Sequence, residues 1–245
     1  MTRLRVARLP ACVAAAVLLA GCGSGDDPAD AAPSSSSSSS PASASSAPGT
    51  DLAPGLLPAE AFGAGAQVTP LTEAQLAQGA ALAGGSTEGL EVSPPECADV
   101  VQTTQPSFDE YEDVAAQVAV LGTTTTVQAL VAGGPAADAL STFQPPRDGC
   151  TSVQVTSPQI GTATVDYAEL DVPDLGDGSA GVSVTTTVAG PDGQPLSVPA
   201  LVGLVQDGER ALVLLSTDTR GGAPDAAAFT DLLQKAFDAQ AAALG

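Results

Sequence analysis

Cysteine is the residue type with the widest chemistry in this chain, and its four copies lie in two different settings. Cys12 and Cys22 lie near the N-terminus, and Cys22 directly follows the sequence Leu19-Ala20-Gly21. Cys97 and Cys150 lie far along the chain. A thiol can be acylated, paired in a disulfide, bound to a metal or used as a nucleophile. The surroundings of each cysteine therefore decide its role.

The absence of histidine narrows these roles. The chain contains neither histidine nor tryptophan, and its sequence also lacks asparagine. Without an imidazole, Ser-His-Asp and Cys-His catalysis have no proton carrier, and zinc loses its commonest nitrogen ligand. Carboxylate chemistry or no chemistry remains. Of these we predict the second, so that the protein is not an enzyme and has no metal site and no cofactor.

The segment before Cys22 has the layout of a secretion signal. Three arginines among the first eight residues precede an apolar run at 11–20, which is too short to span a bilayer as a permanent helix. The sequence Leu19-Ala20-Gly21-Cys22 resembles the bacterial lipoprotein signal, whose cysteine is diacylated and becomes the mature N-terminus. The resemblance implies that residues 1–21 are removed and that acyl chains such as palmitate on Cys22 anchor the protein to the cell membrane, on its extracytoplasmic face. The alternative is an ordinary secretory signal with a chance cysteine.

Residues 22–50 are rich in serine and proline and include an unbroken serine run at 34–40. This segment has no apolar face to bury, so we expect a disordered tether. Its root-mean-square reach is about 30 Å, enough to hold a domain clear of the lipid head groups. We predict that the remaining residues, 51–245, form a single globular domain.

The mature chain is strongly anionic. Removal of residues 1–21 takes away three of seven basic residues and none of 28 acidic ones, so the net charge becomes 4 − 28 = −24. Nucleic-acid binding needs clustered basic residues and is excluded. A negative field favours basic or metal-ion partners, although solubility alone is a simpler explanation.

The pattern of residues 51–245 predicts an α+β fold in which several helices pack on an antiparallel sheet. Proline and glycine punctuation and helical spacing indicate helices at 56–63, 71–82, 94–101, 135–143 and 224–244. Alternation and β-branched residues indicate strands at 114–121, 123–131, 151–156, 162–170, 181–188, 197–205 and 210–215. The short turns between these strands, such as Asp207-Gly208, favour hairpins over βαβ units.

Cys97 and Cys150 are the two cysteines left in the mature domain. In an extracytoplasmic compartment we expect them to form a disulfide, with two free thiols as the alternative. The bridge would close 53 residues of chain (150 − 97). For such a loop the chain-entropy model gives about 4 kcal/mol of stabilisation.

Two further patterns have simple interpretations. Residues 176–181 match G-x-G-x-x-G, but strand-like residues follow them, whereas the nucleotide-binding motif opens a helix. We interpret this stretch as a glycine-rich turn. Two acidic clusters offer the oxygen ligands that calcium prefers, but the EF-hand spacing is absent, so solvated acids are the simpler interpretation. These clusters are residues 109–113 and the set Asp166, Glu169, Asp171, Asp174 and Asp177.

Taken in order, these features resemble the extracellular sensor domain of actinobacterial serine/threonine kinases, the PknH-like domain, and its free-standing lipoprotein relatives. The stretches that carry the resemblance are Leu56 to Gly63, Ser93 to Val101 with Cys97, and Pro135 to Cys150. The resemblance implies a sheet packed by helices, with a cleft for an envelope ligand. One cysteine pair stands where some members have two disulfides, and the sequence contains no kinase or transmembrane segment. The resemblance therefore implies nothing about direct signalling by this chain.

From these observations we expect a membrane-anchored lipoprotein whose domain binds an unknown envelope ligand or protein. The alternative is a structural or chaperone-like envelope protein that acts through its surface, without a pocket for a small ligand. A deep cleft would favour the first function and a flat apolar patch the second.

Overall fold

The computed structural model describes residues 51–72, 74–76, 78, 90–98, 101, 110–143, 149–157, 161–190 and 192–245. All of these belong to one compact unit. The predicted signal peptide, Cys22 and the tether lie outside the described residues. No helix in the described part of the chain is long and apolar enough to span a membrane.

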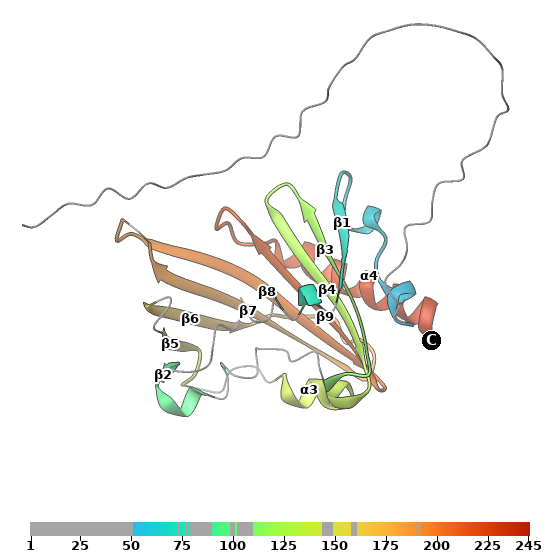
Figure 1. The fold of residues 1–245 in the computed structure, drawn as a ribbon, viewed down its shortest axis with the longest axis horizontal. Coiled ribbons are helices and arrows are strands. Elements are labelled where there is room, and N and C mark those ends of the chain that lie inside the picture. The colour runs from blue at the N-terminus through green and yellow to red at the C-terminus, as the bar shows by residue number, and fades with distance from the viewer. Residues whose placement is uncertain are drawn as a thin grey trace, which may run out of the picture. The chain divides into compact units, whose positions relative to one another are not determined.

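Among the described residues, nine strands form one antiparallel sheet in the order β1-β3-β4-β9-β8-β7-β6-β5-β2. Hairpins build most of it, because β3 and β4 are joined by a short turn, as are β7 and β8, and β8 and β9 (Figure 1). The strands are β1 (Gln67–Leu71), β2 (Glu91–Ser93), β3 (Asp113–Leu121), β4 (Thr124–Ala132), β5 (Ser152–Ser157), β6 (Gly161–Glu169), β7 (Gly178–Ala189), β8 (Pro195–Asp207) and β9 (Arg210–Asp218).

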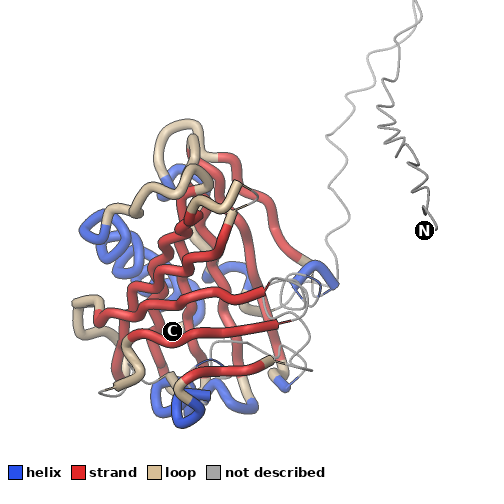
Figure 2. The backbone as a smooth tube through the Cα atoms, turned by 90° about the vertical axis from the view of Figure 1, so that its left-hand side faces the viewer, coloured by secondary structure: helices blue, strands red, loops and turns tan. Residues whose placement is uncertain are grey.

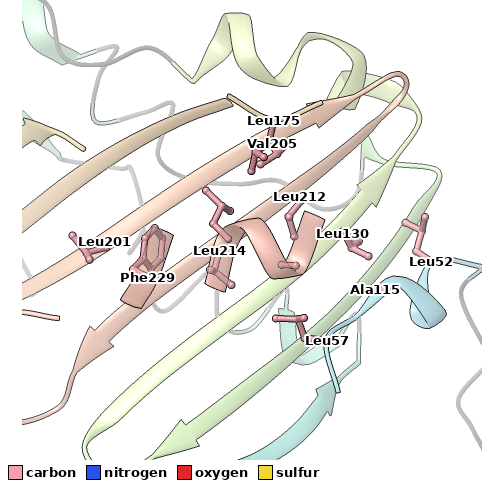
Figure 3. Close-up of a cluster of buried hydrophobic side chains, with 12 residues drawn as sticks. Leu52, Leu57, Ala115, Leu130, Leu175, Leu201, Val205, Leu212, Leu214 and Phe229 are labelled. Atoms are coloured by element: carbon pink, nitrogen blue, oxygen red, sulfur yellow. The ribbon is translucent and has the colours of Figure 1, made fainter. Parts of the chain in front are cut away.

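One face of the sheet is covered by the long helix α4 (Ala226–Leu244). Its apolar residues recur at helical spacing, so a single stripe containing Phe229 and Leu233 is buried against the strands. Figure 3 shows Phe229 beside Leu201 and Leu214 of the sheet. A Cβ atom on Gly203 of β8 would lie 2.9 Å from Leu233 Cδ2, so the close approach of α4 requires glycine at that position.

The opposite face is covered by shorter elements. Leu130 and Val131 are consecutive in β4, so their side chains point to opposite faces. Leu130 packs with α4, whereas Val131 packs with Ala136 and Ala139. These two alanines belong to η5 (Gly134–Asp138) and α3 (Ala139–Thr142). Figure 2 shows the strands running side by side through the domain with helices at its sides.

The α+β prediction is confirmed only in part, because the sheet dominates and the helices are few and mostly short. The predicted helix at 56–63 is instead a single 3-10 turn, η2 (Ala59–Phe62), and a separate 3-10 turn, η1 (Ala53–Gly55), precedes it. The chain is extended between them, with Pro58 at φ −70° and ψ 157°, and therefore cannot continue as one helix. The segment at 94–101 contains a 3-10 turn, η3 (Pro95–Cys97).

The start of the predicted helix at 71–82 was also wrong. Leu71 is the last residue of β1, and helical conformation is found at 74–76 and at 78, whereas residues 79–82 lie outside the described residues. The predicted hairpin at 114–131, the later strands and the terminal helix are confirmed, with ends that differ by a few residues.

Candidate functional site

A surface cavity of about 350 Å³ lies between α4, η2 and the adjoining ends of β3, β4 and β9. Its volume falls at the lower end of the range for small-molecule sites. We call this cavity the α4 groove. The sheet and its turns contribute Ala119, Leu121, Thr124, Thr126 and Ser216; η2 and its end contribute Ala61, Phe62 and Gly63; the helix side contributes Pro224, Asp225, Ala228, Phe229, Asp231, Leu232 and Lys235.

The helix wall follows from the local sequence of α4. The N-cap residue Asp225 accepts a hydrogen bond from the backbone N–H of Ala228 at 3.0 Å, which satisfies one amide of the first turn. Residues 225, 228, 232 and 235 follow one another at spacings of three and four, so they lie along one side of the helix. The helix wall from the N-cap Asp225 to Lys235 is about 15 Å long at 1.5 Å per residue.

The floor of the groove is a row of small residues in register across three strands. Ala119 pairs with Thr126, and Thr126 pairs with Ser216. The hydroxyls of Thr126 and Ser216 are buried and lie 3.3 Å apart, so they form a hydrogen bond with each other. The small side chains leave room above the sheet, which is why a cavity exists beside the helix.

The wall formed by η2 is attached to the sheet by a buried amide network. Gln117 and Gln128 pair across β3 and β4, one row along from the floor. The Gln128 Oε1 accepts hydrogen bonds from the Leu57 N–H at 3.0 Å and from Gln117 Nε2 at 2.8 Å. Gln117 Nε2 also donates to the Leu57 carbonyl at 2.8 Å. These bonds hold the chain just before η2 in place, although the buried Gln128 Nε2 finds no hydrogen-bond acceptor.

Gly63 ends η2 and forms the rim of the groove. Its φ of +117° is a conformation that residues with a Cβ rarely adopt. A Cβ atom there would also lie 2.9 Å from Leu121 Cδ2. Glycine therefore allows η2 to turn into β1 while Leu121 packs against the rim.

Three ionisable side chains line the groove, and their charges at neutral pH sum to −1: Asp225, Asp231 and Lys235. In the described part of the chain, Asp231 and Lys235 form no ion pair, and the ion pair that is found joins Arg210 to Asp207 at 2.9 Å. The residues lining the groove include no cysteine and no histidine. The lining therefore combines apolar surface with three charged side chains.

Exposed apolar side chains lie near the ends of two separate hairpins. Val120 and Leu121 are 41% and 40% exposed at the β3–β4 turn. Leu196 and Val198 are 53% and 42% exposed in the part of β8 that pairs with β7 alone. In Figure 1 the β3–β4 turn lies at the top and the β7–β8 turn lies at the far left, so the two pairs of residues are apart. Because Leu121 also lines the groove, the groove opens at the β3–β4 turn.

The expected disulfide between Cys97 and Cys150 is present, with their Cα atoms 5.5 Å apart. Both cysteines are buried in an apolar cluster with Val153 and Tyr167, and burial raises the pKa of the Tyr167 hydroxyl. The bridge ties η3 to the residue two positions before β5. It holds that edge of the domain together and is separate from the α4 groove.

The acidic clusters do not form a metal centre in the described residues, where no group of three or more candidate ligands could hold an ion. Asp177 accepts a hydrogen bond from the Gly208 N–H at 2.7 Å, so it stabilises the β8–β9 turn. Asp109 lies outside the described residues, and Asp113 begins β3. The stretch at 176–181 leads into β7 at Gly178, which agrees with its interpretation as a turn.

Sequence reasoning missed the α4 groove. Its residues come from separate segments, and their spacing in the sequence carries no sign that they meet. The available signals were the helix start at Pro224-Asp225 and the run of small hydroxyl residues at 123–126. Neither signal identifies a partner surface.

No family model and no curated protein matches the chain. Among solved structures, an uncharacterised protein from Mycobacterium smegmatis, an Rv0999 orthologue, matches with a TM-score of 0.52 and 16% identity, over 78% of this chain and 96% of that one. The extracellular domain of PknH from Mycobacterium tuberculosis matches with a TM-score of 0.44 and 15% identity, over 78% of this chain and 95% of that one. The PknH domain named by the sequence resemblance is thus among the matching structures. The comparison with the M. smegmatis protein shows that the two chains share a fold.

Proposed function

We propose that this protein is a membrane-anchored extracytoplasmic lipoprotein whose domain binds a ligand in the α4 groove and catalyses no reaction. The observation that carries the proposal is the groove itself, a cavity of about 350 Å³ in which apolar and polar side chains converge. Concave, mostly apolar sites with a few placed polar groups are the usual form of a small-ligand site.

The proposed location has two independent supports. Leu19-Ala20-Gly21-Cys22 provides an acylation signal, and the 50 residues before the domain provide a signal peptide and a tether. The disulfide between Cys97 and Cys150 agrees with an oxidising compartment outside the cytoplasm. In cells, the unmodified protein should fractionate with membranes and Cys22→Ala should appear in the medium. A Cys22→Ala protein that stays membrane-bound would contradict the anchor.

Ligand binding is tested with the full chain carrying Cys22→Ala, so that no detergent is needed. Its thermal unfolding is measured alone and with envelope lipids, glycans and small amphiphiles. A ligand at a hundred times its Kd stabilises a folded protein by about 2.7 kcal/mol, which raises Tm by several degrees. The added substitution Ala228→Phe, which places a ring in the groove, should abolish the shift. If no compound class raises Tm, ligand binding is refuted.

A structural or chaperone-like role is the second candidate. The exposed apolar side chains of Leu196 and Val198, two residues apart on β8, favour it, because exposed apolar surface can mark a protein contact. In this case Val198→Asn would weaken association with envelope proteins, while Ala228→Phe would leave it unchanged. The opposite pattern would favour the ligand-binding function.

A further inference from the structure

We infer that the α4 groove takes a single-chain amphiphile with a positively charged head group. This inference rests on the proposed ligand-binding function and specifies the class of ligand.

The shape and lining of the groove favour an extended apolar chain. Its helix wall is about 15 Å long, and its volume is about 350 Å³, so the groove has room for one short alkyl chain and not for a bulky ligand. Phe62, Leu121 and Leu232 supply apolar surface in the groove. An alkyl chain lying there would be removed from water, and each buried methylene would tighten binding about fourfold.

The charges favour a cation at the polar end of such a ligand. Asp225 is engaged by the Ala228 N–H, whereas Asp231 makes no hydrogen bond or ion pair with any described residue. Lys235 lies one turn further along α4 and offsets one of the two carboxylates, which leaves the lining at −1. The Asp231 carboxylate is therefore the group in the groove that is free to face a cationic head group.

The field of the whole protein acts in the same direction. The full chain carries a net charge of −21, and its acidic residues outnumber its basic ones by 28 to 7. A field of this sign raises the local concentration of cations and lowers that of anions. A carboxylate head group would be repelled both by this field and by Asp231. A neutral head group would be neither repelled nor attracted.

The test compares three ligands that share one decyl chain: decyltrimethylammonium, decanol and decanoate. Each is titrated into the full chain carrying Cys22→Ala, below the concentration at which it forms micelles or separates from solution, and the heat of binding is measured. We expect the ammonium compound to bind most tightly and decanoate most weakly, with a head-group effect of about two- to fivefold for a partly exposed charge. Its affinity should fall with added salt, while that of decanol should not.

Two matched pairs of substitutions locate the site. Asp231→Asn should weaken the ammonium compound two- to fivefold and leave decanol unchanged. Asp238→Asn is the control, because it makes the same change in net charge on an exposed residue of α4 that does not line the groove. Ala228→Phe should abolish binding of all three ligands, whereas Ala227→Phe, at an exposed neighbour outside the lining, should not.

The outcomes separate this inference from the proposed function. Equal affinities for the three head groups, or tightest binding of decanoate, would overturn the inference and leave ligand binding intact. An equal effect of Asp231→Asn and Asp238→Asn would also overturn it. Failure of all three amphiphiles while another compound class raises Tm would overturn the inference alone. Failure of every compound class would overturn the proposed function as well. If Ala228→Phe does not fold, the comparison of Asp231→Asn with Asp238→Asn still tests the inference.

Discussion

Removal of the disulfide between Cys97 and Cys150 should cost the domain a large share of its stability. Both cysteines are buried, at 0% and 5% exposure, in the apolar cluster that contains Val153 and Tyr167. The bridge closes a loop of 53 residues. In the unfolded chain this link restricts the ensemble, so reduction should lower the free energy of unfolding by about 4 kcal/mol.

Replacement of both cysteines by alanine should cost more than reduction does. Reduction leaves the two sulfur atoms in the core, whereas Cys97→Ala with Cys150→Ala also leaves two small voids, at about 1 kcal/mol each. For a domain of this size, a loss of about 4 kcal/mol corresponds to a decrease in Tm of about 8 to 16 °C. The double variant should unfold a few degrees lower still.

The assay is urea unfolding of the Cys22→Ala protein in oxidised and reduced form, together with the double alanine variant in the same background. The free energy of unfolding of the oxidised protein minus that of the reduced protein measures the effect of the disulfide cross-link. The value for the reduced protein minus that for the alanine variant measures the packing of the two sulfur atoms. Oxidised and reduced proteins that unfold within 1 kcal/mol of each other would refute the loop-closure reasoning. A reduced protein equal to the alanine variant would refute the packing argument.

Three further predictions concern the packing and charge of the domain. Gly203→Ala should destabilise it by about 1 to 3 kcal/mol in urea unfolding, because the new Cβ would lie 2.9 Å from Leu233 Cδ2; an unchanged midpoint would contradict the close packing of α4. Arg210→Ala should lower the free energy of unfolding by about 1 kcal/mol, because Arg210 Nη1 donates to the carbonyl of Leu244 at 2.8 Å, near the negative end of α4. Arg210→Lys keeps the positive charge and should restore part of this loss. Burial raises the pKa of Tyr167 above its ordinary value of 10, so its contribution to the free energy of unfolding is fully present below pH 10 and is lost as pH rises through the folded pKa. The difference in free energy of unfolding between wild type and Tyr167→Phe should therefore change between pH 8 and pH 11. A constant difference would contradict the pKa shift.

The cysteine pair and the hairpins are the parts of the structure that were accessible from the sequence. The β8–β9 turn follows from Asp207-Gly208, since Gly208 adopts the φ of +62° that this turn needs. Helix α4 follows from an apolar stripe that begins after Pro224-Asp225. The disulfide follows from the number of cysteines and the compartment indicated by the N-terminal signal. Each of these signals involves neighbouring residues or a simple count.

The short elements at the sheet edges were not accessible in this way. β1 contains Pro70 and carries little apolar pattern, and β2 has three residues, so neither resembles a strand until its partner is known. β1 pairs with β3, and β2 pairs with β5 more than 60 residues further along the chain. Pro70 is tolerated because β1 is an edge strand, where an absent N–H breaks no ladder.

The sequence by itself determined the anionic charge, the absence of imidazole chemistry, the hairpins, α4 and the expectation of a lipid anchor at Cys22. Only the tertiary structure decided that β9 pairs with β4, and that η2 lies opposite α4 above the row formed by Ala119, Thr126 and Ser216. The reason is physical. Helix and turn signals arise from residues a few positions apart, whereas a groove depends on which distant segments pack together and on the space that small side chains leave between them.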